Sequence, residues 1–153
     1  MSDRIAIIGI SGSGKSRLAR ELGARSGLPV VQMDALFWSG SWRPVPEAEY
    51  LAAHECLIES ERWIIEGYVD AAMAGRLRRA DQVIFLDPPG WLCAWRVIRR
   101  WLEHRRSARP ELSPEALERF QLRFLWTVTT RAERPAILAA LEGVDPTKIV
   151  RRG

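Results

Sequence analysis

The sequence predicts an α/β fold built on a parallel β-sheet. Short apolar runs alternate with helix-compatible stretches along the 153 residues, and each run is bounded by polar or turn-forming residues. The first run leads directly into a glycine-rich segment that precedes a helix. A chain of this length matches one domain with a single core. We therefore expect residues 1–153 to form one domain.

Five apolar runs are expected to form the strands of the sheet. They are residues 5–8, 29–33, 63–65, 83–86 and 148–150. Parallel strands place their carboxyl ends at one edge of a sheet, where ligands bind. The residues that follow these strands, Gly9, Asp34, Glu66 and Asp87, should therefore meet at that edge.

Helices are expected between these strands. The first covers residues 15–26, where Leu18 and Leu22 share an apolar face, and it ends at Gly27. Further helices are expected over residues 47–61, 71–79 and 88–105. The last of these begins with Asp87 as its N-cap and Pro88 in its first turn.

Two more helices are expected in the last third of the chain. Ser113, followed by Pro114 and Glu115, begins one of them by the same capping signal. Pro135 separates this helix from a last one over residues 136–142, before the final strand.

The glycine-rich segment, residues 9–16, fits the Walker A pattern G-x-x-x-x-G-K-[ST]. Its glycines let backbone N–H groups turn toward an anion, and the helix that follows adds the positive end of its dipole. Lys15 should reach the β- and γ-phosphates of a nucleotide, and the Ser16 hydroxyl should be a ligand of Mg²⁺. The residues expected to bind the nucleotide are Gly9, Ser11, Gly12, Ser13, Gly14, Lys15, Ser16 and Arg17.

The positive charge of the chain comes almost wholly from arginine. The net charge is +4, and Lys15 and Lys148 are the only lysines. Nine arginines lie between Arg76 and Arg109. Such a concentration fits either a clamp for phosphates or a nucleic-acid patch, and composition does not choose between them.

Several classes of protein are disfavoured by the remaining composition. No apolar run approaches the roughly 20 residues that span a bilayer, and the chain begins with a strand rather than a signal peptide. Cys56 and Cys93 form no C-x-x-C or Cys/His cluster, which indicates reduced thiols. We therefore expect a cytoplasmic protein without a membrane partner and without a metal held by protein ligands alone.

The chain resembles adenylate-kinase-like P-loop proteins, in particular those labelled bacterial DNA topology modulation (FlaR-like) proteins. The resemblance rests on the form G-x-x-G-x-G-K-S of residues 9–16 and on four further segments. These are MDALFW at 33–38, WIIEGY at 63–68, VIFLD at 83–87 and PGWLCAWR at 89–96. The resemblance covers most of the chain. It implies a three-layer fold, a five-stranded sheet in the order 2-3-1-4-5, ATP and Mg²⁺ as ligands, and phosphoryl transfer.

The resemblance also implies roles for the arginines. Arg96 and Arg100 stand at the i, i+4 spacing of the pair that holds the transferring phosphates in adenylate kinases, and Arg99 could substitute for one of them. Residues 101–113 would form a short lid carrying Arg105, Arg106 and Arg109. A short lid favours a small acceptor.

Two carboxylates are candidates for the acceptor side of the site. Asp34 suits an acceptor hydroxyl or a magnesium-bound water, although it could merely cap a turn. Glu66, followed by Gly67, stands where related sequences have Asp-Gly; it could contact magnesium or the acceptor, or pair with a neighbouring arginine. Asp87 is adequately explained by helix capping.

The aromatic residues and histidines are assigned structural rather than catalytic roles. Trp38 and Trp42 could stack on a flat acceptor such as a nucleobase, although core packing is favoured. Four other tryptophans recur at helical spacing or lie within helical stretches and are interpreted as packing: Trp91, Trp95, Trp101 and Trp126. His54 and His104 have no partner pattern that suggests catalysis.

These residues together predict an ATP-dependent kinase that acts on a small hydroxyl- or phosphate-bearing molecule, such as a nucleotide. The catalytic candidates are Lys15, Asp34, Arg96 and Arg100, and the acceptor candidates are Asp34, Trp38, Glu66 and Gly67. Two alternatives remain: a nucleotide-dependent regulatory ATPase associated with DNA or RNA, and a nucleotide-binding module without turnover.

Overall fold

The computed structural model describes residues 2–39, 43–67, 70, 72–104 and 121–153. Within these residues, five parallel strands form one sheet in the order β2-β5-β1-β6-β7. Their bounds are β1 Arg4–Gly9, β2 Val30–Gln32, β5 Trp63–Gly67, β6 Gln82–Leu86 and β7 Ile149–Arg152. The short strands β3 (Trp38–Ser39) and β4 (Arg43–Pro44) form a separate antiparallel pair.

The expected five-stranded parallel sheet is confirmed. Its order β2-β5-β1-β6-β7 reads 2-3-1-4-5, as expected, when only the five strands of this sheet are counted, and the labels differ because β3 and β4 precede β5 along the chain. The pair β3–β4 was not predicted, and it comes between the second and third strands of the main sheet along the chain. Strands of two residues carry too little alternation to be recognised in a sequence.

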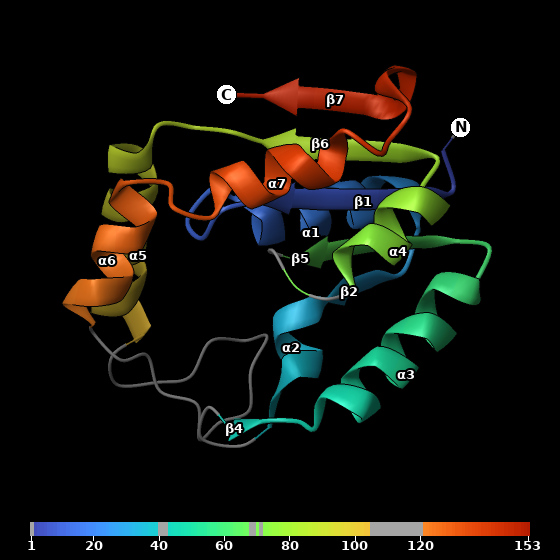
Figure 1. Ribbon diagram of the computed structural model, residues 1–153, viewed down its shortest axis with the longest axis horizontal. Coiled ribbons are helices and arrows are strands. Elements are labelled where there is room, and N and C mark those ends of the chain that lie inside the picture. Colours follow the sequence, from blue (N-terminus) through green and yellow to red (C-terminus); the bar gives the residue numbers. More distant parts are fainter. Residues whose placement is uncertain (1, 40–42, 68–69, 71, 105–120) are drawn as a thin grey trace.

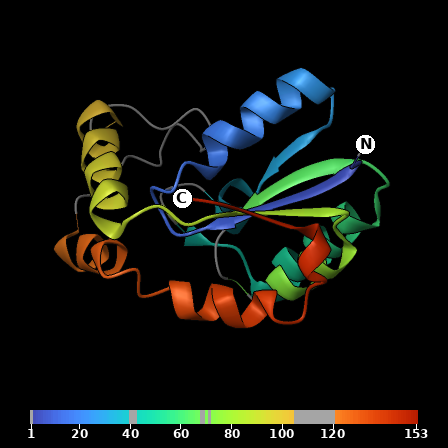
Figure 2. The ribbon, with the colours of Figure 1, turned by 90° about the horizontal axis from the view of Figure 1, so that it is seen from above.

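Helices cover both faces of the sheet. Helix α1 (Lys15–Ser26) lies on one face, while α3 (Glu47–Glu59), α4 (Met73–Arg79) and α7 (Arg134–Leu141) lie on the other (Figure 2). Helices α5 (Gly90–His104) and α6 (Leu122–Thr129) stand at the end toward which the strands point (Figure 1). The remaining short elements are α2 (Met33–Phe37) and the 3-10 turn η1 (Pro146–Lys148). Among the described residues, no helix combines the length and apolar character needed to cross a membrane.

The central strand β1 contributes to both cores. Ile5 and Ile7 pack with Ala19 of α1, whereas Ala6 and Ile8 belong to the cluster on the other face. Side chains of a strand alternate between the two faces of a sheet, so a run that is apolar at every position fits a strand covered on both sides. The sheet is thereby fixed beneath the loop that follows β1.

The predicted start of the long helix at Asp87 is wrong. Helix α5 begins at Gly90, and the Pro89 carbonyl accepts the first-turn hydrogen bond from the Cys93 N–H at 3.2 Å. A Cβ on Gly90 would lie 2.0 Å from the Thr129 carbonyl oxygen, so glycine permits α5 and α6 to approach closely here. The Asp87 side chain is used instead in ion pairs described below.

The predicted helices near the C-terminus also need correction. Pro135 lies in the first turn of α7 rather than between two helices, a position where its missing N–H costs nothing. Helix α6 ends at Thr129, and Arg131 in the connection has φ 56°. The expected helix start at Ser113 lies outside the described residues.

The expected lid, residues 101–113, is described only at its beginning. Residues 101–104 are the last turn of α5. Arg105, Arg106 and Arg109 lie outside the described residues, as does Trp42.

The packing interpretation of the helical tryptophans is wrong for three of the four. Trp91, Trp95 and Trp126 are 68%, 57% and 66% exposed, whereas Trp101 is half-buried. Helical spacing identifies residues that share a face, but it does not tell whether that face meets the core or the solvent.

Candidate functional site

The predicted phosphate-binding loop connects β1 to α1 at the carboxyl edge of the sheet. Gly12 has φ 78°, and Gly14, the N-cap of α1, has φ 100°. A Cβ on Gly12 would lie 2.4 Å from the Cys93 carbonyl oxygen, so the first turn of α5 packs directly on the loop. Glycine is needed at position 12 for its positive φ and for this close approach of α5. The loop backbone is thereby kept free of side-chain bulk.

Lys15 is the cation around which the charged groups of this region gather. Its Nζ donates to the Ile10 carbonyl at 3.0 Å. Burial lowers the pKa of Lys15, while the nearby carboxylates of Glu66, Asp34 and Glu133 favour its charged form and Arg100 opposes it. Residues from five different parts of the chain thus meet at the end of β1.

Ser16 and Glu66 are brought together by the pairing of β1 with β5. The Ser16 hydroxyl donates to Oε1 of Glu66 at 2.7 Å, and Glu66, beside Ile7 in the sheet, is 4% exposed. Both groups offer the hard oxygen atoms that Mg²⁺ prefers. The nearby Ser13 hydroxyl is buried without a hydrogen-bond partner among the described residues. These oxygen atoms fit a magnesium ion bound together with a phosphate chain.

Asp34 lies in the first turn of α2, directly after β2, and is half-buried. Its charge acts on both Lys15 and Glu133, so the structure brings Asp34 to the loop as its position after a strand predicted. Glu66, one strand closer to β1, lies on the same side of the sheet. The two carboxylates therefore flank the loop from the β2–β5 side.

The other two acceptor candidates have packing roles. The ring of Trp38 meets that of Phe37 edge to face, with centroids 4.8 Å apart. Gly67 is buried, and a Cβ there would lie 2.9 Å from Cγ of Met33. Gly67 therefore provides space for a neighbouring side chain.

Arg96 projects from α5 onto the loop, and Arg100 follows it about one turn later on the helix. Nη1 of Arg96 donates to the carbonyls of Gly12 and Ser13 at 3.3 and 3.2 Å, and Arg100 influences Lys15 electrostatically. Arg99 points elsewhere and pairs with Glu103 at 2.8 Å on the exposed side of the helix. Arg17, predicted to bind the nucleotide, pairs with Glu21 at 2.9 Å on the surface of α1.

Glu133 acts electrostatically on Lys15 and was missed by the sequence analysis. Burial raises the pKa of its carboxyl group, Asp34 raises it further, and Lys15 lowers it. The residue stands in the connection between α6 and α7, more than 100 positions from Lys15, and no motif surrounds it. Only the folded chain brings the two together.

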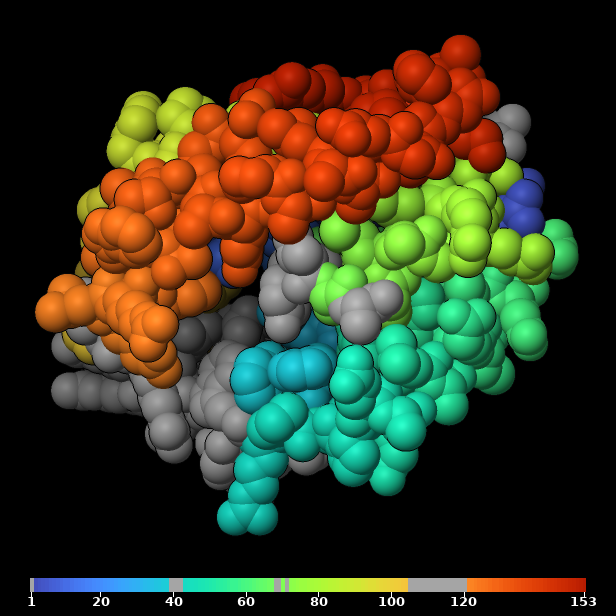
Figure 3. Space-filling model, viewed as in Figure 1, coloured from blue at the N-terminus to red at the C-terminus, as the bar shows by residue number. Residues whose placement is uncertain are grey.

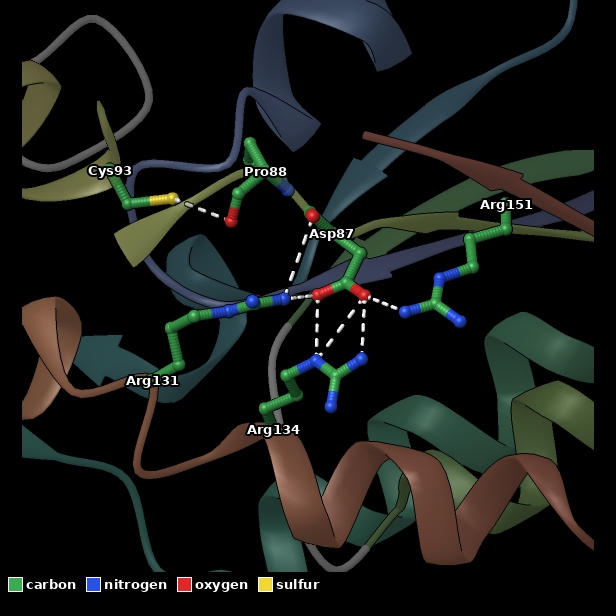
Figure 4. Close-up of polar contacts among 6 residues, drawn as sticks. All are labelled: Asp87, Pro88, Cys93, Arg131, Arg134 and Arg151. Carbon is green, nitrogen blue, oxygen red and sulfur yellow. Dashed lines mark hydrogen bonds and ion pairs between the residues drawn. The ribbon is translucent and has the colours of Figure 1, made fainter. Parts of the chain in front are cut away.

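Asp87 holds this connection in place (Figure 4). Its side chain is 5% exposed and receives Nε and Nη2 of Arg134, both at 2.9 Å, together with ion pairs from Arg131 and Arg151. Its backbone N–H donates to the Arg152 carbonyl at 2.7 Å. The carboxylate thereby links the α6–α7 connection and β7 to the end of β6.

Along the chain, Glu133 lies between two of these arginines, Arg131 and Arg134. In Figure 3, α6 and α7 form a continuous band across this face of the molecule. Asp87 thus holds Arg131 and Arg134, which lie on both sides of the segment that carries Glu133, to the end of β6.

Comparison of the sequence with models of protein families gives no match, and comparison with curated proteins also gives none. Solved structures give clear matches over most of the chain. A deoxyadenosine kinase from M. mycoides with bound dATP matches with a TM-score of 0.56 and 12% identity, over 97% of this chain and 90% of that one. A sugar kinase from Janibacter sp. matches with a TM-score of 0.52 and 17% identity, over 96% of this chain and 83% of that one. A shikimate kinase from Acinetobacter baumannii in complex with shikimate matches with a TM-score of 0.50 and 14% identity, over 92% of this chain and 94% of that one.

These likenesses establish the fold. The chain has the α/β fold of P-loop kinases, with a five-stranded parallel sheet and helices on both faces. The resemblance to topology modulation proteins receives no support from the comparisons.

Proposed function

We propose that the protein is a kinase that transfers the γ-phosphoryl group of ATP to a small hydroxyl- or phosphate-bearing acceptor. The observation that carries the proposal is the hydrogen bond of Ser16 to Glu66, at 2.7 Å, beside a glycine loop that ends in Lys15. The matching kinase folds, one of them with bound dATP, support a nucleotide as the donor. In this proposal residues 1–153 act as one domain, and residues 101–113 serve as its lid.

The donor half of the proposed site is the phosphate-binding loop. Backbone N–H groups of residues 9–16 and the N-terminus of α1 would hold the phosphates, and Lys15 would exchange its bond to the Ile10 carbonyl for bonds to the β- and γ-phosphates. Ser16 and Glu66 would hold Mg²⁺, which supplies charge neutralisation when bound. Arg96 already touches two loop carbonyls and with Arg100 would neutralise charge that develops during transfer.

The acceptor half is proposed to lie on the β2–β5 side of the loop. Asp34 would orient the acceptor hydroxyl and take its proton, because it is the half-buried carboxylate nearest to a strand end on that side. Trp38 and Gly67 are retained as candidate acceptor contacts. Most of the rate enhancement would come from positioning and electrostatics, as is typical of phosphoryl transfer.

Isotopically labelled ATP tests the proposal directly. Purified protein is incubated with γ-labelled ATP, Mg²⁺ and separate pools of nucleosides, nucleotides and sugar acids, and the products are separated by chromatography. A labelled product that requires the protein and is lost in Lys15→Ala is expected. ATP that binds without labelling any pool would favour a nucleotide-binding module without turnover.

The nucleic-acid alternative has less support from the structure. Several arginines that gave the sequence its basic cluster make bonds within the fold. Arg76 forms a buried pair with Asp70 at 2.8 Å, Arg79 donates to the Ile58 carbonyl at 2.9 Å, and Arg96 contacts the loop. A row of arginines directed at solvent is what a phosphate backbone requires.

A further inference from the structure

Every large apolar side chain that is exposed in the described part of the chain lies on one pair of neighbouring helices. We call this set the α5–α6 patch. It comprises Trp91, Trp95 and Leu102 on α5, and Leu122 and Trp126 on α6, with exposures from 50% to 72%. Contiguous apolar patches of this kind on a protein surface mark interaction sites. Neither half of the proposed kinase site uses these residues.

The α5 part of the patch has the spacing of a helix-packing stripe. Trp91, Trp95, Ile98 and Leu102 follow one another at intervals of four, three and four residues, which places them along one side of a helix. The buried residues Gly90, Ala94 and Val97 lie about 100° away around the helix. This 4-3-4 spacing is the one with which a helix packs lengthwise against another helix.

The two helices that carry the exposed residues pack against each other. Gly90, at the start of α5, meets the carbonyl of Thr129 at the end of α6. Trp91 is the neighbour of Gly90, and Trp126 lies about one turn before Thr129. The pair stands at one end of the molecule, beyond the sheet (Figures 1 and 2). The patch is therefore accessible to another macromolecule.

We propose that the occupant of this patch is a second copy of the chain, packed through the same patch in a symmetric dimer. Three tryptophans between 57% and 68% exposed and two leucines present an area of roughly 500 to 650 Å². Two copies would then bury about 1,000 to 1,300 Å², which reaches the range of specific interfaces. A two-fold axis lets one stripe pack against its own copy, and tryptophan is enriched at the centre of such interfaces.

Charge favours a second copy over a polyanion. Arg99, which follows Ile98 on α5, is compensated by Glu103 at 2.8 Å, and Arg96 is directed at the phosphate-binding loop on another side of the helix. Single-stranded nucleic acid binds where aromatic side chains are combined with a groove of uncompensated positive charge. On α5 the patch borders a neutral ion pair, Arg99 with Glu103, which suits the same border of a second copy.

The dimer is tested by sedimentation equilibrium of the full chain over a range of concentrations. The wild-type protein is expected to show twice the mass of the chain. Trp95→Arg and Trp126→Arg are expected to raise the dimer dissociation constant by at least about 30-fold, because each places a charge at the centre of the interface. Ala136→Arg, at an exposed position of α7 outside the patch, is the matched control and should dimerise like the wild type.

The folding of each variant is checked by circular dichroism and urea unfolding, so that loss of the dimer is not confused with loss of the fold. A wild-type protein that remains monomeric up to a concentration of about 100 μM would overturn the proposal. Dimers that persist in folded Trp95→Arg and Trp126→Arg would place the interface elsewhere. Quenching of tryptophan fluorescence by single-stranded oligonucleotide in a monomeric wild type would identify nucleic acid as the occupant and equally overturn it.

Discussion

The ammonium group of Lys15 donates to the Ile10 carbonyl at 3.0 Å, in a region where three carboxylates act on its charge. Burial lowers the pKa of this lysine, because a charged group loses hydration when it is enclosed by the protein. A phosphate chain in the loop would supply the negative charge that best compensates this loss. The single lysine of the loop is therefore the residue whose removal should affect the donor most.

We expect Lys15→Ala to weaken ATP binding by about 2 to 3 kcal/mol, the size of a lost charge-assisted interaction. The fold should be kept, since the side chain makes one hydrogen bond to the backbone of its own loop. Isothermal titration calorimetry measures the affinity. Lys148→Ala removes the only other lysine and is the matched control. Equal affinity in the two variants would contradict the role of Lys15.

Asp34→Asn is expected to separate binding from transfer. The amide keeps the size of the side chain but cannot take a proton, so ATP should bind nearly as in the wild type while transfer falls by about 100-fold or more. Transfer to the acceptor found with labelled ATP provides the measurement. If the turnover of the variant matched that of the wild type, Asp34 would have no part in the reaction.

His54 contributes a pH dependence to stability that is unrelated to the site. It is fully buried, neither ring nitrogen has a hydrogen-bond partner among the described residues, and burial together with Arg76 lowers its pKa. A histidine whose folded pKa lies below its unfolded value binds its proton only in the unfolded state as the pH falls. Stability is therefore retained above the unfolded pKa of about 6.5 and lost as the pH falls below it.

We expect the free energy of unfolding to fall by at most about 1.4 kcal/mol per pH unit from this residue. His54→Leu should reduce the loss measured by urea unfolding between about pH 7.5 and 5.5, since it removes the titrating group. His104→Gln, which replaces the other histidine of the chain, should leave the His54 contribution in place. The prediction fails if wild type and His54→Leu lose stability in parallel.

At the scale of elements, the Asp87 ion pairs link the α6–α7 connection to the end of β6 and reinforce the pairing of β6 with β7. Arg131 and Arg134 belong to the α6–α7 connection, and Arg151 belongs to β7. The carboxylate is almost fully buried, whereas the three guanidinium groups remain 27% to 56% exposed. Loss of the carboxylate would leave arginines that water can partly solvate, which limits the cost.

Asp87→Asn is expected to lower the free energy of unfolding by about 1 to 3 kcal/mol, the range for hydrogen bonds to charged groups. Urea unfolding measures the change. Glu21→Gln breaks an exposed pair with Arg17 and should cost less than about 0.5 kcal/mol. Equal effects of the two substitutions would mean that the Asp87 ion pairs contribute no more than a surface pair.

Features whose residues are contiguous in the sequence could be predicted. Features that depend on contacts between residues far apart in the sequence could not. The phosphate-binding loop was recognised because its glycines, Lys15 and the start of α1 are contiguous. Asp87 was interpreted as a helix cap because the following Pro88 is the only partner that the sequence displays, while its three arginines lie 44 to 64 positions away. Glu133 was missed for the same reason.

The exposed tryptophans mark another limit of sequence reasoning. Trp91 and Trp95 share a side of α5 with Ile98 and Leu102, and this periodicity is the same whether the side meets a core or a partner molecule. An apolar stripe on a helix predicts a packing contact, but the sequence alone does not tell whether the contact is with the core of the same chain or with another molecule. These residues were interpreted as packing within the chain, and the exposure of Trp91, Trp95 and Trp126 shows that this interpretation was wrong for all three.

For the whole molecule, the sheet order divides the charges around the phosphate-binding loop. Asp34 follows β2 and Glu66 ends β5, on one side of the central strand β1. Asp87 with its arginines lies at the ends of β6 and β7, on the other side. A nucleotide held at the end of β1 would thus have Asp34 and Glu66 on one flank, and on the other flank guanidinium groups that are already paired with Asp87.

The net charge of +4 raises the question of how tightly the protein binds DNA. Three arginines of the basic cluster, Arg76, Arg79 and Arg96, bond within the fold and are therefore less available for a phosphate backbone. We expect affinity for duplex DNA no better than the nonspecific range of about 10⁻⁴ to 10⁻⁶ M at physiological salt. Fluorescence anisotropy of a labelled duplex at several salt concentrations measures it. Tight binding whose logarithm falls steeply with the logarithm of salt would require about six or more phosphate contacts. That outcome would restore the regulatory ATPase as the better description of this chain, because a salt dependence of that size arises from counterions released by phosphate contacts.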